Sequence, residues 1–195
     1  SIDNFGSPLG KGWTHNYNLL LFGGHAGSLG LKQGDGRIVY FKLSQGIYYP
    51  DASSGEDSYI TYTSDTYTLV EKAGTTYTFN ATTGKLTSIR DRNGNTTTLS
   101  YTDEALTAVT DPSGRVIYLT YDSQNKISTV RDLNNNTYTF TYTNGTLVSL
   151  SFPLVGSATG ESAGVENLSG WSYSYDANGK MLTKTDPSGY TTTYN

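Results

Sequence analysis

The sequence predicts an all-β protein built as an antiparallel ribbon of β-hairpin repeats. A tyrosine recurs at separations of 20 and 21 residues, and an aspartate recurs ahead of it at the same separations. The short segments between these marks alternate bulky and hydroxyl side chains. A fixed period in this range indicates a repeat architecture, and period-two alternation indicates half-buried strands. The paired marks are Asp91 with Tyr101, Asp111 with Tyr121, and Asp132 with Tyr142.

The composition excludes several kinds of site. Of the 195 residues, 35% are hydrophobic and 15% are charged, and the formal net charge is −4. No cluster of Lys and Arg exists, so we expect no nucleic-acid partner. Cysteine is absent, which excludes disulfides and thiolate metal sites. No run of about 18 apolar residues occurs, so we expect no membrane span.

Residues 1–74 are predicted to form a β-rich opening region that caps the repeats. Its first part is rich in glycine, which favours turns. Residues 16–22 (NYNLLLF) read as a buried strand, with Trp13 and Tyr17 as aromatic anchors that hold this part of the chain on a sheet.

Two further patterns in this region predict short strands in a meander. A Gly-Asp-Gly turn at 34–36 lies between apolar segments within residues 29–43, which indicates a hairpin. Residues 59–63, 67–71 and 75–79 then alternate with short turns between them.

Residues 75–195 are predicted to be tandem repeats. Each first strand ends in an aromatic residue and alternates with Thr or Ser, so one face carries the bulk and the other the hydroxyl groups. The predicted repeat-core aromatics are Tyr77, Phe79, Tyr101, Tyr121, Phe140, Tyr142, Tyr173 and Tyr175.

The second strand of each repeat breaks this alternation. Leu86 and Ile89 stand three residues apart, and the same spacing recurs twice further along the chain. Either a bulge shifts the strand or both faces are partly covered. The recurring pairs are Leu106 with Val109 and Ile127 with Val130.

Turns recur at matched places, and one loop interrupts the array. An aspartate leads each turn, often with Gly fourth, which is typical of a type I turn whose carboxylate bonds the backbone two residues on. Residues 151–170 lack alternation and are predicted to be an exposed loop inserted between repeats. The predicted turn residues are Asp91, Gly94, Asp111, Gly114, Asp132, Asp186 and Gly189.

These motifs resemble the RHS/YD-repeat family of bacterial surface and toxin proteins, which is related in architecture to teneurins. The carrying segments are 121–132, 175–181 and 186–189, with the opening residues 6–17. The resemblance implies a ribbon that spirals into a shell or forms an open curved sheet, at the cell surface or outside the cell. In toxin members the shell encloses a C-terminal payload.

No catalytic, cofactor or metal site is predicted. The two histidines, His15 and His25, have no triad or metal-ligand spacing around them. The acids between residues 35 and 57 follow no calcium-loop spacing, which favours solvated loop charges over a calcium site. In the family, an Asp-Pro-x-Gly-Leu motif takes part in self-cleavage. Asp111 and Asp186 begin similar strings, but both occupy the repeat turn and are interpreted as turn residues.

The favoured function is a non-enzymatic structural β-scaffold of a secreted or surface protein, as part of a shell, stalk or self-assembling fibre. One alternative is a carbohydrate-binding adhesin module, with Trp171 as the candidate glycan contact. Another is the shell fragment of a polymorphic toxin. The predicted partners are further repeats of the same or a longer chain, or copies of the chain that pair through open strand edges.

Overall fold

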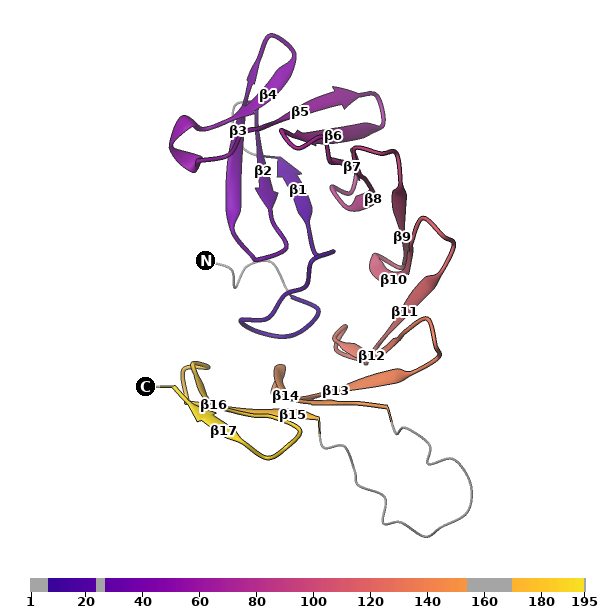
Figure 1. The fold of residues 1–195 in the computed structure, drawn as a ribbon. Helices are drawn as coiled ribbons and strands as arrows, with labels where there is room; N and C mark the ends of the chain where they lie inside the picture. The colour runs from indigo at the N-terminus through magenta and orange to yellow at the C-terminus, as the bar shows by residue number, and fades with distance from the viewer. Residues whose placement is uncertain (1–6, 24–26, 154–169, 195) are drawn as a thin grey trace. The chain divides into compact units, whose positions relative to one another are not determined.

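The structure, a computed structural model, describes residues 7–23, 27–153 and 170–194 (Figure 1). It confirms the all-β class: the described residues form 17 strands and one short 3₁₀ turn, and the strands make an open antiparallel sheet of hairpins. The strands are β1 Leu20–Gly23, β2 Ser28–Lys32, β3 Ile38–Ser44, β4 Ile47–Pro50, β5 Ser58–Thr63, β6 Thr66–Glu71, β7 Thr76–Asn80, β8 Leu86–Arg90, β9 Thr96–Thr102, β10 Ala105–Thr110, β11 Val116–Tyr121, β12 Ile127–Arg131, β13 Thr137–Thr143, β14 Thr146–Ser151, β15 Trp171–Tyr175, β16 Met181–Thr185 and β17 Thr191–Thr193.

The chain divides into two compact units. Of the described residues, those within 14–116 form the first unit, and residues 7–13 with those from 117 to 194 form the second. Within the first unit, consecutive strands pair antiparallel, from β1 with β2 through β9 with β10. The strands β11 to β17 pair in the same way. The predicted division at residue 74 describes the sequence pattern and stays a prediction.

One face of the first unit holds its core. Ile60, Leu69, Tyr77 and Ile89 stand directly opposite one another across β5 to β8. Opposed residues in an antiparallel ladder share a face, so this row marks the inner face of the unit. The least exposed side chains of this unit are Leu31, Phe41, Ile60, Phe79 and Leu86. In the second unit, Ile127 is equally well buried.

The three-residue spacing of the second strands comes from bulges. In β8, Thr78 faces Ser88 but Phe79 faces Leu86, so Thr87 has no residue opposite it. The extra residue lets Leu86 and Ile89 point to the same face despite their odd separation. Of the two explanations that the sequence left open, a bulge or two partly covered faces, the structure shows the bulge. Register shifts at the matching place occur in the pairs β9–β10, β11–β12, β13–β14 and β15–β16.

The predicted strand over residues 16–22 is wrong in its first part. His15 and Asn18 form a turn in which the Asn18 backbone N–H donates to the His15 carbonyl over 2.9 Å. The Asn18 side chain also donates to Thr14, and such local bonds compete with strand pairing. The strand β1 therefore begins only at Leu20.

The beginning of β1 also contacts the β7–β8 hairpin. The Leu21 N–H donates to the Gly84 carbonyl over 2.9 Å, and Leu20 bridges Lys85. A Cβ atom at Gly84 would lie 1.8 Å from the Leu21 carbonyl oxygen, and φ at Gly84 is +69°. Only glycine therefore allows this approach.

The predicted inserted loop at 151–170 lies mostly outside the described residues. β14 ends at Ser151 and β15 begins at Trp171, and the two strands pair through Leu150 opposite Trp171. The repeat pattern therefore continues on both sides of residues 154–169.

Candidate functional site

The aspartate-led turns have one repeated geometry. In the turn after β12, the Asp132 Oδ1 accepts the backbone N–H groups of Asn134 at 2.8 Å and Asn136 at 2.9 Å. The fourth residue, Asn135, has φ of +62°, which is the position where other copies place Gly. This confirms the predicted bond to the backbone two residues on, and adds a second bond four residues on. The same pair of bonds occurs at Asp91, Asp111, Asp122, Asp176 and Asp186.

These hydrogen bonds favour the charged form of the carboxylates. A side-chain bond from Asn95 is the main cause that lowers the pKa of Asp91, and Arg115 and Asn136 do the same for Asp111 and Asp132. Sequence reasoning placed Asp122 and Asp176 in the repeat motif but did not include them among the predicted turn residues. The signal was present, because each is followed at the fourth position by Asn or Gly.

The repeat tyrosines are more than apolar bulk. The Tyr142 hydroxyl on β13 donates to the Ile127 carbonyl on β12 over 2.9 Å. Tyr101 bonds Leu86 at 2.8 Å in the same way, and Tyr175 bonds Leu147 at 2.8 Å. We call these three contacts the tyrosine locks.

Each lock lies beyond the end of a short ladder. The strands β8 and β9 share three residue pairs, from Arg90 opposite Thr96 to Ser88 opposite Thr98. The Asp91 turn closes one end of this ladder, and the bond from Tyr101 to Leu86 closes the other, past the bulge. The pair β12–β13 repeats the arrangement with the Asp132 turn and Tyr142.

Two kinds of turn explain the alternating repeat length of 20 and 21. Tyr101 faces Leu106 across a two-residue turn, Asp103-Glu104, in which both residues have positive φ. Tyr121 faces Ile127 across the Asp122 turn, which is one residue longer. The tyrosine and its partner keep the same pairing in both, so the length difference is confined to the turn.

The segment 7–13 lies across the hairpins of the second unit. The Trp13 indole N–H donates to the Tyr175 hydroxyl over 2.8 Å, and Tyr175 in turn donates to Leu147. The Trp13 ring also meets Tyr173 edge to face, with 4.8 Å between ring centroids. Trp13 is therefore an aromatic anchor, as predicted, and its partners are the repeat aromatics of β15.

Backbone contacts hold the rest of this segment. The Ile127 N–H donates to the Pro8 carbonyl and the Lys126 ammonium to the Ser7 carbonyl, both over 2.8 Å. A Cβ atom at Gly10 would lie 2.6 Å from the Gly145 carbonyl oxygen. The segment thus contacts three successive hairpins, β11–β12, β13–β14 and β15–β16. These contacts could not be predicted from the sequence, because the partners are more than a hundred residues apart along the chain.

The remaining predicted residues lie at separate places. Trp171 is the first residue of β15, and the Lys184 ammonium lies 4.0 Å from its ring centroid. A cation–π contact therefore occupies one face of the candidate glycan-binding ring. Phe79 is fully buried, Tyr121 and Phe140 are half-buried on β11 and β13, and Tyr77 borders a cavity of the first unit.

Of the two histidines, the structure describes only His15, and its surroundings do not favour a catalytic role. Burial, with the nearby charge of Lys32, lowers the pKa of His15 to about 4, so its imidazole is neutral at pH 7. His25 lies outside the described residues. The acids near residues 35–57 each have a basic or backbone partner: Asp35 with the Arg37 N–H, Asp51 with Lys42, Glu56 with Arg37, and Asp57 with Lys72. Within residues 7–23, 27–153 and 170–194, no group of three His, Asp or Glu side chains could hold a metal ion.

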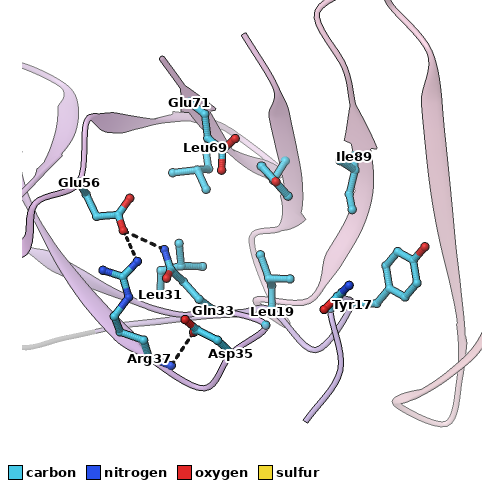
Figure 2. Close-up of a pocket in the computed structure, with 13 residues that line it drawn as sticks. Tyr17, Leu19, Leu31, Gln33, Asp35, Arg37, Glu56, Leu69, Glu71 and Ile89 are labelled. Atoms are coloured by element: carbon cyan, nitrogen blue, oxygen red, sulfur yellow. Dashed lines mark hydrogen bonds and ion pairs between the residues drawn. The ribbon is translucent and has the colours of Figure 1, made fainter. Parts of the chain in front are cut away.

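A cavity of about 590 Å³ opens on the inner face of the first unit (Figure 2). Its walls come from residues 16–19, from the β2–β3 hairpin, from Glu56, and from β6 to β8. Two of these walls, residues 16–19 and the β2–β3 hairpin, are in close contact. A Cβ atom at Gly34 in the hairpin would lie only 3.0 Å from the Asn16 Cα. The volume lies within the roughly 300–1,000 Å³ typical of small-molecule sites.

Polar groups gather at one side of this cavity and apolar groups line the rest. Glu56 accepts from the Arg37 guanidinium at 2.5 Å and from the Gln33 amide at 3.3 Å (Figure 2). Glu71 accepts a hydrogen bond from the Tyr77 hydroxyl. Burial and the charge of Glu56 raise the pKa of Glu71, and the bond from Tyr77 offsets part of that rise. Sequence reasoning named Tyr17, Tyr77, Ile89 and the acids between residues 35 and 57 for other reasons, and it did not place them together.

Comparison with known proteins gives no assignment. No family model matches the chain, and no curated protein matches it. In the part of the chain that the structure describes, no helix is long and apolar enough to cross a membrane.

Proposed function

We propose that this chain is a structural β-scaffold of the RHS/YD-repeat type, from a secreted or cell-surface protein, with no catalytic role. The observation that carries the proposal is the repeated set of aspartate turn, bulge and tyrosine lock at β8–β9 and β12–β13. The aspartate turns bond main-chain N–H groups of their own turn, the tyrosine locks bond main-chain carbonyls of the neighbouring strand, and the bulges set the register between strands. Their purpose is therefore to stack hairpins in register, which is what a shell, stalk or fibre requires.

Assembly through a strand edge is part of this proposal. The strand β17 pairs with β16, with Thr192 opposite Lys184. The Asp186 N–H donates to the Tyr190 carbonyl, and the Tyr194 N–H donates to the Leu182 carbonyl. In an antiparallel pair the residues that bond the partner alternate with those that face away, so the even-numbered residues of β17 are the ones whose amides face β16. The amides of Thr191 and Thr193 consequently point to the other side, where a strand of another copy or of a longer chain would pair.

Light scattering after size-exclusion chromatography, over a range of concentrations, tests the assembly. We expect the wild-type mass to rise with concentration and Thr193→Pro to abolish the rise, because proline removes the outward N–H and leaves the bonds to β16 intact. Thr193→Val keeps the N–H and is the matched control. A wild-type chain that stays monomeric at every concentration contradicts self-assembly.

The alternative is a carbohydrate-binding module. Exposed tyrosines on β3, β4 and β5 favour it, since rings on a sheet face can stack on sugars. Tyr40 is 50% exposed, Tyr49 47% and Tyr59 38%. A glycan array with the wild type, Trp171→Ala and Tyr49→Ala separates the two functions: binding that either substitution removes supports the alternative, and no binding leaves the scaffold.

A further inference from the structure

The cavity of the first unit has an excess of negative charge. Three carboxylates (Asp35, Glu56 and Glu71) and one guanidinium (Arg37) line it, which gives a formal charge of −2. Arg37 is already engaged, because its side chain pairs with Glu56 and its backbone N–H donates to Asp35 over 2.9 Å. Among the residues that the structure describes, no other cation lines the cavity.

Glu71 is the carboxylate that a ligand would meet. Its partner is the neutral Tyr77 hydroxyl, and among the described residues no ion pair includes it. The next residue, Lys72, pairs instead with Asp57. The carboxylate is half-buried beside the like charge of Glu56, so the protein itself does not balance its charge.

The other walls suit hydrocarbon. Leu19, Leu31, Leu69 and Ile89 supply aliphatic surface, and Leu31 is 1% and Leu69 4% exposed. The rings of Tyr17 and Tyr77 also border the space, and aromatic faces attract cations. An anionic ligand would be repelled, and a neutral one would leave the charge of Glu71 unbalanced.

We propose that this cavity binds a cationic organic group, an ammonium or guanidinium that pairs with Glu71 and whose hydrocarbon stem lies along Leu31, Leu69 and Ile89. Such a group belongs to a free diamine or to a Lys or Arg side chain of a peptide. The site is independent of the proposed scaffold function, since it lies on the inner face and not at a strand edge.

Calorimetric titration at low salt, with four probes, tests the site on the whole chain. The probes are cadaverine, agmatine, Nα-acetyl-lysine amide and the neutral Nα-acetyl-norleucine amide. We expect the cations to bind at least about tenfold more tightly than the norleucine compound, because a half-buried charge pair distinguishes them. Binding by the lysine amide indicates a peptide side chain as the natural ligand, and binding by the free amines alone indicates a small molecule. Equal binding of the neutral probe, or no binding by any cation, overturns the proposal.

Glu71→Gln should lower the affinity for the cations about tenfold or more, whereas Glu104→Gln, outside the cavity, should leave it unchanged. The Glu104 side chain is 83% exposed, which makes it the matched control. Because folding raises the pKa of Glu71, its charge disfavours the folded state at neutral pH, so we expect Glu71→Gln to fold. Wild-type methyl NMR gives a second measurement: cadaverine should shift Leu31, Leu69 and Ile89, and shifts confined to other residues overturn the proposal.

Discussion

The Tyr142 hydroxyl and the Ile127 carbonyl, 2.9 Å apart, close the open end of the β12–β13 pair. At the other end of the same pair the Asp132 carboxylate holds the turn. A strand pair with three residue pairs is thus closed at both ends by side chains that bond the backbone.

Removing one tyrosine lock should destabilise the protein measurably. We expect Tyr142→Phe and Tyr101→Phe each to lower the free energy of unfolding by about 1 kcal/mol, the usual net value of such a hydrogen bond. Urea denaturation measures the change. Tyr190→Phe, at a side chain that is 73% exposed, is the control and should have almost no effect. Equal effects at all three positions would show that the hydroxyl bond contributes nothing specific.

The aspartate turns should make stability depend on pH in acid. The folded-state pKa of Asp91, Asp111 and Asp132 is lowered, so their contribution is complete above the ordinary carboxyl pKa of about 4 and is lost as pH falls below it. We expect the urea midpoint of the wild type to fall between about pH 4 and pH 2.

The triple variant Asp91→Asn, Asp111→Asn, Asp132→Asn should show a flatter profile over this range. Asp65→Asn, in a loop outside the repeated turns, should keep the wild-type profile. A triple variant with the unchanged wild-type slope would refute the role of the carboxylates.

The approach of β1 to the β7–β8 hairpin should make Gly84 indispensable. Gly84→Ala introduces a Cβ atom 1.8 Å from the Leu21 oxygen, and we expect a loss of about 2–4 kcal/mol in unfolding free energy. Gly46→Ala is the matched control, because Gly46 has φ of +83° but no atom within 4 Å of the added Cβ. It should lose only about 1 kcal/mol, the cost of the left-handed backbone. Similar losses in both variants would mean that the contact with Leu21 has no role.

The contact between Trp13 and Tyr175 should be energetically coupled. A double-mutant cycle with Trp13→Phe and Tyr175→Phe measures it by urea unfolding. We expect a coupling energy of about 0.5–1.5 kcal/mol, because each single change removes the same indole-to-hydroxyl bond. A coupling of zero would place the segment 7–13 off the hairpins in solution.

One substitution should stabilise the protein. Glu104 has φ of +71° in the turn after Tyr101, where the repeat at Asn144-Gly145 has glycine. Glu104→Gly relieves the left-handed backbone and gives up an ion pair of 3.6 Å in which the Glu104 side chain is 83% exposed, so we expect a gain of about 0.5–1 kcal/mol. The thermal unfolding midpoint measures it, and a decrease would show that the ion pair with Lys85 outweighs the backbone strain.

The strands and turns could be predicted because their signals are local. The alternation from Tyr138 to Tyr142 and the Asp-x-x-Gly turns depend on neighbours within a few residues, and both appear in the structure. The start of β1 could not be predicted, because the apolar residues after Asn18 hide a turn that side-chain bonds stabilise.

The choice between bulges and two covered faces needed the partner strand. A spacing of three, as between Leu86 and Ile89, fits either arrangement until the residue opposite Thr87 is known. The tyrosine locks could not be predicted because the acceptor is a main-chain carbonyl, which every residue has. The cavity could not be predicted because its walls come from four separate parts of the first unit.

The two lengths of the turn after the repeat tyrosine indicate where such a chain can accept inserted residues. Tyr101 and Tyr121 keep the same partner position although one turn is a residue longer than the other. Hairpin tips on this side can therefore accept added residues without disturbing the packed face, whereas one residue added between Tyr142 and Phe140 would invert that face. Loops with new binding properties could be grafted at the Asp103-Glu104 and Asn144-Gly145 tips, which makes the ribbon a framework whose variable positions and fixed positions are physically separate.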